Sequence, residues 1–109
     1  MQGLKVRVSV KAANDIADIA DYIEVEFGQK RADRFLSEIR KQIQNLQIFS
    51  RQYGDTGIVY RGHMICKKVF APSVILFYIE DETVFVMRVL REERLWQKII
   101  KEDIDYEFI

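Results

Sequence analysis

Residues 74–96, VILFYIEDETVFVMRVLREERLW, decide the fold. They contain two apolar strands, residues 74–79 and 84–89, joined by the acidic turn Glu80-Asp81-Glu82. Both strands are apolar at successive positions, which is typical of central strands covered on both faces. The second strand is interrupted by Arg88 and runs into a charged segment that ends at the only tryptophan. A charge within such a strand needs a partner or a function, so this region is the first candidate for a site.

Two further strands precede this stretch. Residues 58–61 and 64–70 are rich in β-branched and aromatic side chains, and turns at Arg61-Gly62-His63 and Ala71-Pro72-Ser73 bound them. The four segments together predict an antiparallel meander. Residues 50–57 carry glycines and little periodicity, which predicts a loop.

The N-terminal part changes from a strand pattern to a helical one. Residues 4–10 alternate apolar and polar, which predicts a strand with one buried face. From Ala12 the spacing becomes helical as far as Gly28, and after a link at residues 29–30 a second amphipathic helix reaches Leu46. The polar side of the first helix carries Asp15, Asp18, Asp21 and Glu24. Two helices with so short a link predict an antiparallel hairpin.

These elements predict one α+β domain over residues 1–109. It consists of an antiparallel β-sheet, an N-terminal helix hairpin on one face, and a short C-terminal helix at residues 92–101 that shields part of the other. The tail at residues 103–109 is unassigned.

Composition excludes several classes of function. The chain has 17 basic and 17 acidic residues, so its net charge predicts no affinity for nucleic acids or membranes. A single cysteine, Cys66, cannot form an internal disulfide or a two-cysteine metal site. We expect no metal and no cofactor. No signal peptide or transmembrane segment is visible, which predicts a cytoplasmic protein.

The order of elements resembles that of the toxins of bacterial type II toxin-antitoxin modules in the RelE/ParE superfamily. The resemblance rests on a strand containing Tyr78, the acidic turn after it, and a strand that leads through arginines to Trp96. The ParE-like branch, which includes plasmid stabilisation proteins, is also matched near the N-terminus. The residues concerned there are Ala13, Asp18, Ile19, Tyr22 and Ile23.

The resemblance implies a small toxin that is neutralised by a cognate antitoxin whose peptide wraps the sheet and helices. For the ParE-like branch it implies growth inhibition by binding DNA gyrase, without catalysis. One alternative is a RelE-like, metal-independent endoribonuclease that cleaves mRNA on the ribosome. Another is a non-toxic domain that only binds its antitoxin.

Metal-free RNA cleavage needs a base, an acid, and cations near the phosphate. If the chain is a ribonuclease, the candidate catalytic residues are Lys68, Arg88, Arg91 and His63. If it binds a target or an antitoxin, the candidate contacts are Arg88, Arg91, Arg94, Trp96 and Lys67. Neighbouring strand residues point to opposite faces, so only one of the two lysines can join the arginines.

The sequence departs from the nuclease branch at several positions. Val74 and Ile75 are apolar where that branch carries an arginine, and Glu92 and Glu93 stand where it has basic residues. A carboxylate there would repel phosphate. We therefore favour binding over catalysis.

Structural interpretations stand beside these functional ones. A salt bridge from Arg88 to Glu80, Glu82 or Glu92 is as compatible with the sequence as a binding role. His63 fits a solvated turn residue, and Trp96 fits a packing anchor of the terminal helix. The basic residues of the second helix are interleaved with acids and fit an ordinary solvated face.

Overall fold

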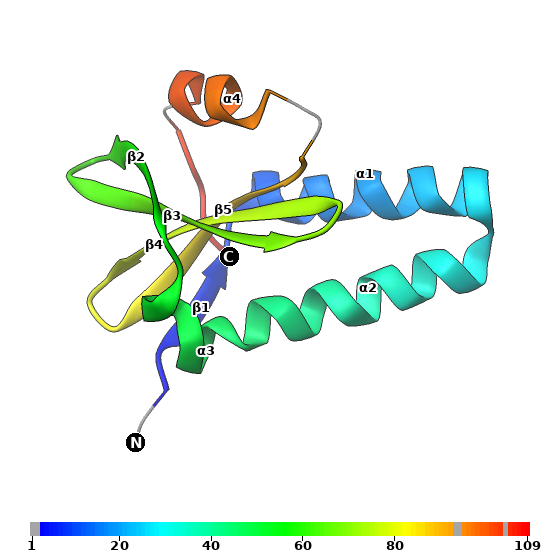
Figure 1. Cartoon of the computed structure of the whole chain (residues 1–109), viewed down its shortest axis with the longest axis horizontal. Coiled ribbons are helices and arrows are strands. Elements are labelled where there is room, and N and C mark those ends of the chain that lie inside the picture. The colour runs from blue at the N-terminus through cyan, green and yellow to red at the C-terminus, as the bar shows by residue number, and fades with distance from the viewer. Residues whose placement is uncertain (1–2, 93–94, 104) are drawn as a thin grey trace.

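The fold combines a five-stranded sheet with a helix hairpin and a short terminal helix (Figure 1). The computed structural model describes residues 3–92, 95–103 and 105–109. The helices are α1 (Val10–Phe27), α2 (Gln29–Gln44), α3 (Leu46–Phe49), the single 3-10 turn η1 (Ser50–Gln52) and α4 (Trp96–Glu102). The strands are β1 (Lys5–Val8), β2 (Asp55–Tyr60), β3 (His63–Phe70), β4 (Ser73–Glu80) and β5 (Thr83–Arg91).

The sheet has the order β1-β5-β4-β3-β2. Strands β2 to β5 form the predicted antiparallel meander. The prediction of a wholly antiparallel sheet is wrong in one respect, because β1 pairs with β5 in parallel, with Val8 opposite Val86. Alternation in residues 4–10 predicts a strand but says nothing about its partner or direction. The α+β class, the hairpin and the terminal helix are confirmed.

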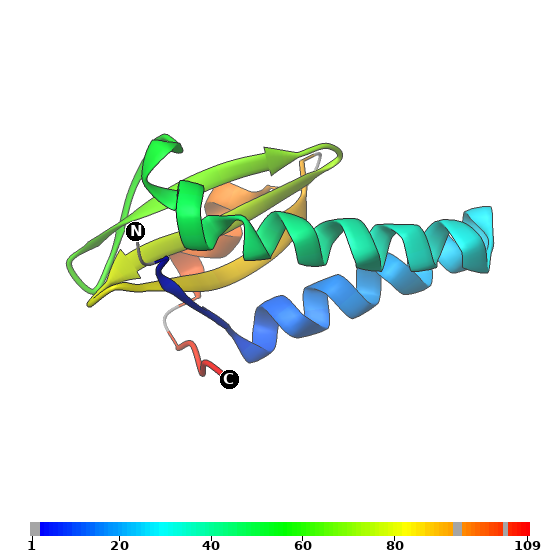
Figure 2. The ribbon, with the colours of Figure 1, turned by 90° about the horizontal axis from the view of Figure 1, so that it is seen from below.

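Both faces of the sheet are covered, as the apolar central strands predict. The hairpin and one face enclose a cluster that includes Ile19, Ile39, Ile75, Phe77, Val84 and Val89. The opposite face packs with α4 and the tail around Ile65, Leu76, Tyr78, Met87, Leu90 and Ile100. Figure 2 shows α2 in front of the sheet and α4 behind it. The closed end of the hairpin projects beyond the sheet in both views (Figures 1 and 2).

The first helix begins earlier than its apolar spacing predicts. Ser9 is its N-cap and accepts a hydrogen bond from the Ala12 amide at 2.8 Å, so Val10 is the first helical residue and does not continue the strand. At the other end, Gly28 has a φ of 95° and is followed directly by α2. The predicted link at residues 29–30 is therefore the first turn of α2.

Residues 50–57 are only partly a loop. Residues 50–52 form η1, and β2 already begins at Asp55, which pairs with Cys66 of β3. Thr56 Oγ1 also donates to the Ile65 carbonyl at 2.9 Å. The register of β2 shifts between Asp55 and Val59, where Gly57 has a φ of 77°. This β-bulge hides the period-two pattern from sequence inspection.

The C-terminal region is more ordered than its sequence indicates. Helix α4 begins at Trp96, later than the predicted residue 92. The unassigned tail then runs antiparallel to β1, with the Ile109 amide donating to the Val8 carbonyl at 2.9 Å and the Val10 amide donating to the Glu107 carbonyl at 2.8 Å. Arg7 Nη2 also donates to the Phe108 carbonyl at 2.9 Å. The tail therefore pairs with the chain where β1 ends and α1 begins. Among the described residues, no helix has the length and apolar character needed to cross a membrane.

Candidate functional site

A β-bulge in the last strand determines where Arg88 points. In the β4–β5 ladder Leu76 lies opposite Arg88 and Phe77 lies opposite Val86, so Met87 is an extra residue between them. Such a bulge re-aims the side chains on either side of it. The outer edge of β5 is open beyond Val86 because β1 ends there. Polar side chains from the start of α1 reach this edge.

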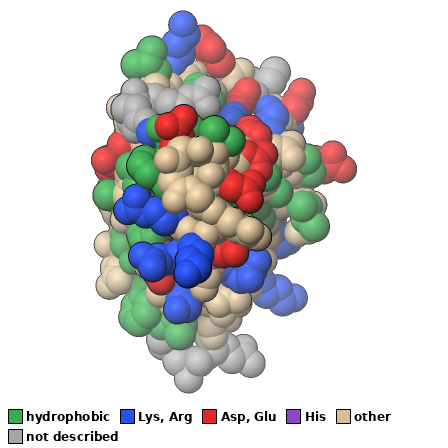
Figure 3. Space-filling model, turned by 90° about the vertical axis from the view of Figure 1, so that its right-hand side faces the viewer, with side chains coloured by type: hydrophobic (Ala, Val, Ile, Leu, Met, Phe, Trp, Pro, Cys, Tyr) green, Lys and Arg blue, Asp and Glu red, His purple; other side chains and the backbone are tan. Residues whose placement is uncertain are grey.

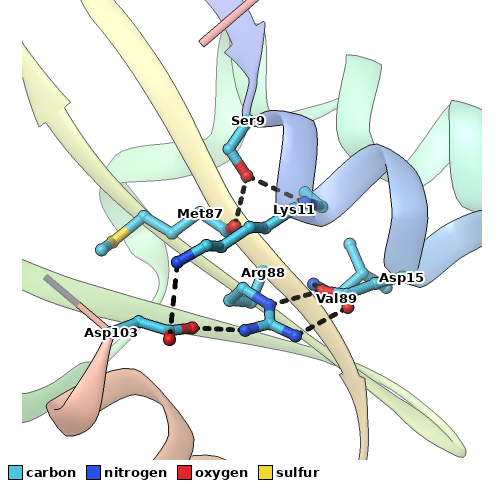
Figure 4. A network of polar contacts seen from close by, with 8 residues as sticks. Ser9, Lys11, Asp15, Met87, Arg88, Val89 and Asp103 are labelled. Carbon is cyan, nitrogen blue, oxygen red and sulfur yellow. Dashed lines mark hydrogen bonds and ion pairs between the residues drawn. The ribbon is translucent and has the colours of Figure 1, made fainter. Parts of the chain in front are cut away.

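Two side chains complete the hydrogen bonding of that edge (Figure 4). The Val89 amide donates to Asp15 Oδ2 at 3.1 Å, and the Ser9 hydroxyl donates to the Met87 carbonyl. Asp15 is only 8% exposed. Its assignment to the polar side of the first helix is therefore wrong, because it lies on the same side as the buried Ile19, one turn away.

The Arg88 guanidinium is held by two carboxylates (Figure 4). Nε donates to Asp15 Oδ2 at 2.7 Å and Nη2 donates to Asp15 Oδ1 at 2.8 Å, which is a bidentate pair. Nη1 donates to Asp103 Oδ2, and Lys11 Nζ lies 3.4 Å from the other oxygen of the same carboxylate. The hydrogen bonds that the guanidinium donates to Asp15 raise the pKa of Arg88 above its usual value. Two cations and two anions thus form a locally neutral network.

The salt bridges expected for Arg88 are not the ones present. The sequence allows a salt bridge to Glu80, Glu82 or Glu92 beside a binding role; a salt bridge is present, but its carboxylates come from Asp15 and Asp103. Glu80 pairs with Thr83 at the far end of the β4–β5 ladder, out of reach of Arg88. The burial of Asp15 could be predicted from the sequence, since it shares a helix face with Ala12 and Ile19. The position of Asp103 could not, because the path of the tail is not encoded in a local pattern.

The two lysines of β3 point to opposite faces, as expected. Lys68 is 4% exposed; its Nζ donates to the Gln42 carbonyl in the last turn of α2 at 2.8 Å and lies 5.1 Å from the Tyr53 ring centroid. Lys67 Nζ lies 5.4 Å from the Trp96 ring centroid on the α4 side. The Lys68 ammonium therefore binds the C-terminal end of α2, where the helix dipole favours a cation. Lys67 and Trp96 form a half-buried pair at the surface.

Arg91 borders a surface groove. Its Cζ lies 4.4 Å from the ring centroid of Tyr22, which is 43% exposed. Two adjoining hollows, of about 210 Å³ and 350 Å³, share this pair and Ile19. The other lining residues include Asp18, Ile23, Phe27, Arg31 and Pro72. An arginine stacked on an exposed aromatic beside apolar side chains is a suitable protein-binding surface.

His63 lies apart from the other candidate catalytic residues. Its ring stacks on Tyr78 with centroids 5.2 Å apart, and Nε2 lies 3.4 Å from Glu80 Oε2. Along β4, Glu80 is at one end, whereas Lys68 pairs with Ile75 and Arg88 pairs with Leu76. Four to five strand residues span about 13–17 Å. The structure therefore does not gather His63, Lys68 and the arginines into one site.

Cys66 and Tyr106 are two further reactive groups in the part of the chain that the structure describes. Burial raises the pKa of the Cys66 thiol, which keeps it protonated near neutral pH. The Tyr106 hydroxyl is buried without a hydrogen-bond partner among the described residues, and burial also raises its pKa. Within residues 3–92, 95–103 and 105–109, no group of three or more His, Cys, Asp or Glu side chains converges on a point. Glu93 and Arg94 lie outside the described residues.

Comparisons with known proteins agree with this architecture. Residues 6–96 match the family model described as ParE toxin of type II toxin-antitoxin system, parDE. A solved chain titled "Chromosomal ParDE TA system from P. aeruginosa" is 22% identical and superposes with a TM-score of 0.67, covering 81% of this chain and 95% of that chain. The comparison with curated proteins finds no match.

The sheet, the projecting hairpin and the family match together define a toxin-type domain of the RelE/ParE superfamily. The chain belongs to the ParE toxin family of type II toxin-antitoxin systems, and the branch predicted from its N-terminal residues is confirmed.

Proposed function

We propose that this ParE-family toxin inhibits growth by binding DNA gyrase and that a ParD-like antitoxin neutralises it. The observation that carries the proposal is the state of Arg88, whose guanidinium is paired with Asp15 and Asp103 and is only 14% exposed. A phosphate could displace these carboxylates only by leaving Asp15 buried and unpaired. Inhibition by protein binding needs no such rearrangement. A cytoplasmic location follows from the proposed target.

The binding surface we propose has two parts. One is the groove beside Arg91 and Tyr22, which offers a cation, an aromatic face and apolar walls. The other is the half-buried Lys67–Trp96 pair on the α4 side. Arg94, which lies between Arg91 and Trp96 in the sequence, remains a proposed contact. Arg88 acts beneath this surface by fixing the end of β5, and in this proposal it does not contact the target.

The test is to induce the chain alone in bacteria and to follow the incorporation of labelled nucleotides and amino acids separately. We expect DNA synthesis to stop first, and purified toxin to inhibit gyrase supercoiling. Arg91→Ala should weaken both effects by about tenfold or more if Arg91 is an interface anchor. Lys5→Ala, at an exposed position on β1, is the matched control and should leave both unchanged.

Three results would contradict the proposal. An immediate arrest of protein synthesis with cleavage of ribosome-bound mRNA would establish the ribonuclease alternative. Normal growth, with stable complex formation with the antitoxin, would establish a non-toxic antitoxin-binding domain. Equal activity of Arg91→Ala and wild type would remove Arg91 from the binding surface.

A further inference from the structure

The two helices of the hairpin carry opposite charges on their solvent-facing sides. The exposed acidic residues of α1 are Asp18, Asp21, Glu24 and Glu26. The exposed basic residues of α2 are Lys30, Arg31, Arg34, Arg40 and Lys41, and they outnumber its one exposed acid, Asp33. Figure 3 faces the closed end of the hairpin and shows red side chains gathered in its upper half, over α1, and blue ones below, over α2. The net charge of zero thus conceals a strongly polarised element.

These charges are not used to hold the hairpin together. Both helices lie wholly within the described residues, and there no ion pair joins an acid of α1 to a base of α2. Arg31 does contact a ring, with its Cζ 5.0 Å from the Phe27 centroid. The two helices pack through small buried residues such as Ala20 and Ala32. Acids and bases are therefore available to a partner.

Three basic residues share one face of α2, which the acids Asp33 and Glu38 flank. Lys30, Arg34 and Lys41 are separated by four and seven positions, which places them on one helix face. At 1.5 Å per residue this row is roughly 16 Å long. Lys30 and Arg34, with Asp21 and Glu24 of α1, lie within seven positions of Gly28, where the two helices meet. This closed end of the hairpin projects past the sheet (Figure 1). A partner can approach there without meeting the sheet.

We propose that this surface docks a second copy of the chain, with α1 of each copy lying against α2 of the other. The argument begins from symmetry. Asp21 and Arg34 lie at nearly equal distances along the chain from Gly28, so they are at the same level of the antiparallel hairpin. A two-fold axis parallel to the helices would bring Asp21 of each copy opposite Arg34 of the other, and the contact would close as a dimer.

Two further observations favour a copy of the chain over another partner. Every copy of the chain carries both the acidic patch of α1 and the basic patch of α2, so two identical copies are complementary to each other. Because the net charge is zero, the two copies do not repel each other at long range. Nucleic acid would be attracted by α2 but repelled by the neighbouring α1. Val25, which is 82% exposed among the acids of α1, supplies an apolar contact. The inference concerns assembly alone and does not depend on gyrase being the target.

The first test is sedimentation velocity of the purified full chain at about 0.05 M and about 1 M salt, because screening lengths fall from roughly 15 Å to 3 Å over this range. We expect a dimer at low salt that dissociates at high salt. A monomer in both conditions overturns the proposal. A dimer strengthened by salt also overturns it, since that is the behaviour of an apolar interface.

Charge reversal gives a sharper test. Lys30→Glu with Arg34→Glu makes α2 acidic, and Asp21→Lys with Glu24→Lys makes α1 basic. Each double variant should dimerise about a hundredfold more weakly than wild type, because like charges then face each other. A mixture of the two should form a heterodimer again, since both helix pairs regain opposite charges.

The matched control is the double variant Lys98→Glu with Lys101→Glu, which reverses two charges on the exposed side of α4. It changes the net charge by the same amount as the α2 variant. This control should dimerise like wild type and should not pair preferentially with the α1 variant. Failure of the mixture to form a heterodimer overturns the proposal, as does equal pairing by the control. Binding of duplex DNA by a wild-type monomer would instead make α2 a nucleic-acid surface.

Discussion

The Arg88–Asp15 pair predicts an unequal response to the loss of its two carboxylates. Asp15→Asn keeps the side-chain shape but removes the charge that neutralises a guanidinium only 14% exposed. Removing one partner of a buried ion pair destabilises a protein by about 3–5 kcal/mol. Because Asn can still accept one hydrogen bond from Arg88 or the Val89 amide, we expect a loss of about 3 kcal/mol.

Asp103→Asn is the matched comparison. Its carboxylate is 27% exposed and contributes a single hydrogen bond to Arg88 and an ion pair to the half-exposed Lys11. Solvent screens such a pair, so its loss should reduce the unfolding free energy by less than about 1 kcal/mol. For a domain of this size, Asp15→Asn should lower the Tm by roughly 12 °C and Asp103→Asn by a few degrees.

Equilibrium unfolding in urea, followed by circular dichroism, measures both values. The m-values should match that of wild type, so that the change in midpoint reports stability. The double variant Asp15→Leu with Arg88→Met should recover only part of the loss, because an apolar pair needs no desolvation of charge but leaves the buried Val89 amide without its acceptor. Equal effects of Asp15→Asn and Asp103→Asn would refute the reasoning, and so would an Asp15→Asn variant within about 0.5 kcal/mol of wild type.

Three further predictions concern other buried polar groups. Ser9→Ala removes the N-cap of α1 and the donor to the Met87 carbonyl together, and urea unfolding should show a loss of about 2–3 kcal/mol. Lys68→Met should cost about 1–3 kcal/mol because the Gln42 carbonyl loses a charged donor, whereas Lys67→Met should change the midpoint little. Burial raises the pKa of Tyr106 in the folded state above the ordinary value of 10.0, so its contribution to stability is complete below about pH 10 and is lost as pH rises further. Tyr106→Phe should therefore flatten the fall in unfolding free energy above pH 10; an unchanged slope would contradict this assignment.

The fold was predictable where local patterns were strong. The all-apolar runs in β4 and β5 imply burial on both faces, and the structure covers them with the hairpin and with α4. The predicted boundaries of helices and strands were wrong near Ser9 and Gly57. Ser9 continues a strand pattern yet caps a helix, and Gly57 sits in a bulge that breaks the period of β2. Pattern alone also could not show that β1 joins β5 in parallel.

The candidate site was only partly predictable for a related reason. The anomaly of Arg88 is visible in the sequence, but its partners lie 73 and 15 positions away and depend on a bulge at Met87 and on the path of the tail. The opposite orientation of Lys67 and Lys68 follows from strand geometry and was predicted. The distance between His63 and the arginines follows from the strand register, which the turns define.

The parallel pairing of β1 with β5 bears on how the chain is made. Val8 meets Val86 across a separation of most of the polypeptide, so α1 and α2 leave the ribosome long before the strands that bury Ile19 and Ile39 exist. Until β5 emerges, the hairpin exposes its apolar side, and the charge of Asp15 is not neutralised by Arg88. The hairpin is thus synthesised first but buried last. Until then it depends on slow pairing of strands that are distant in the sequence, or on a chaperone.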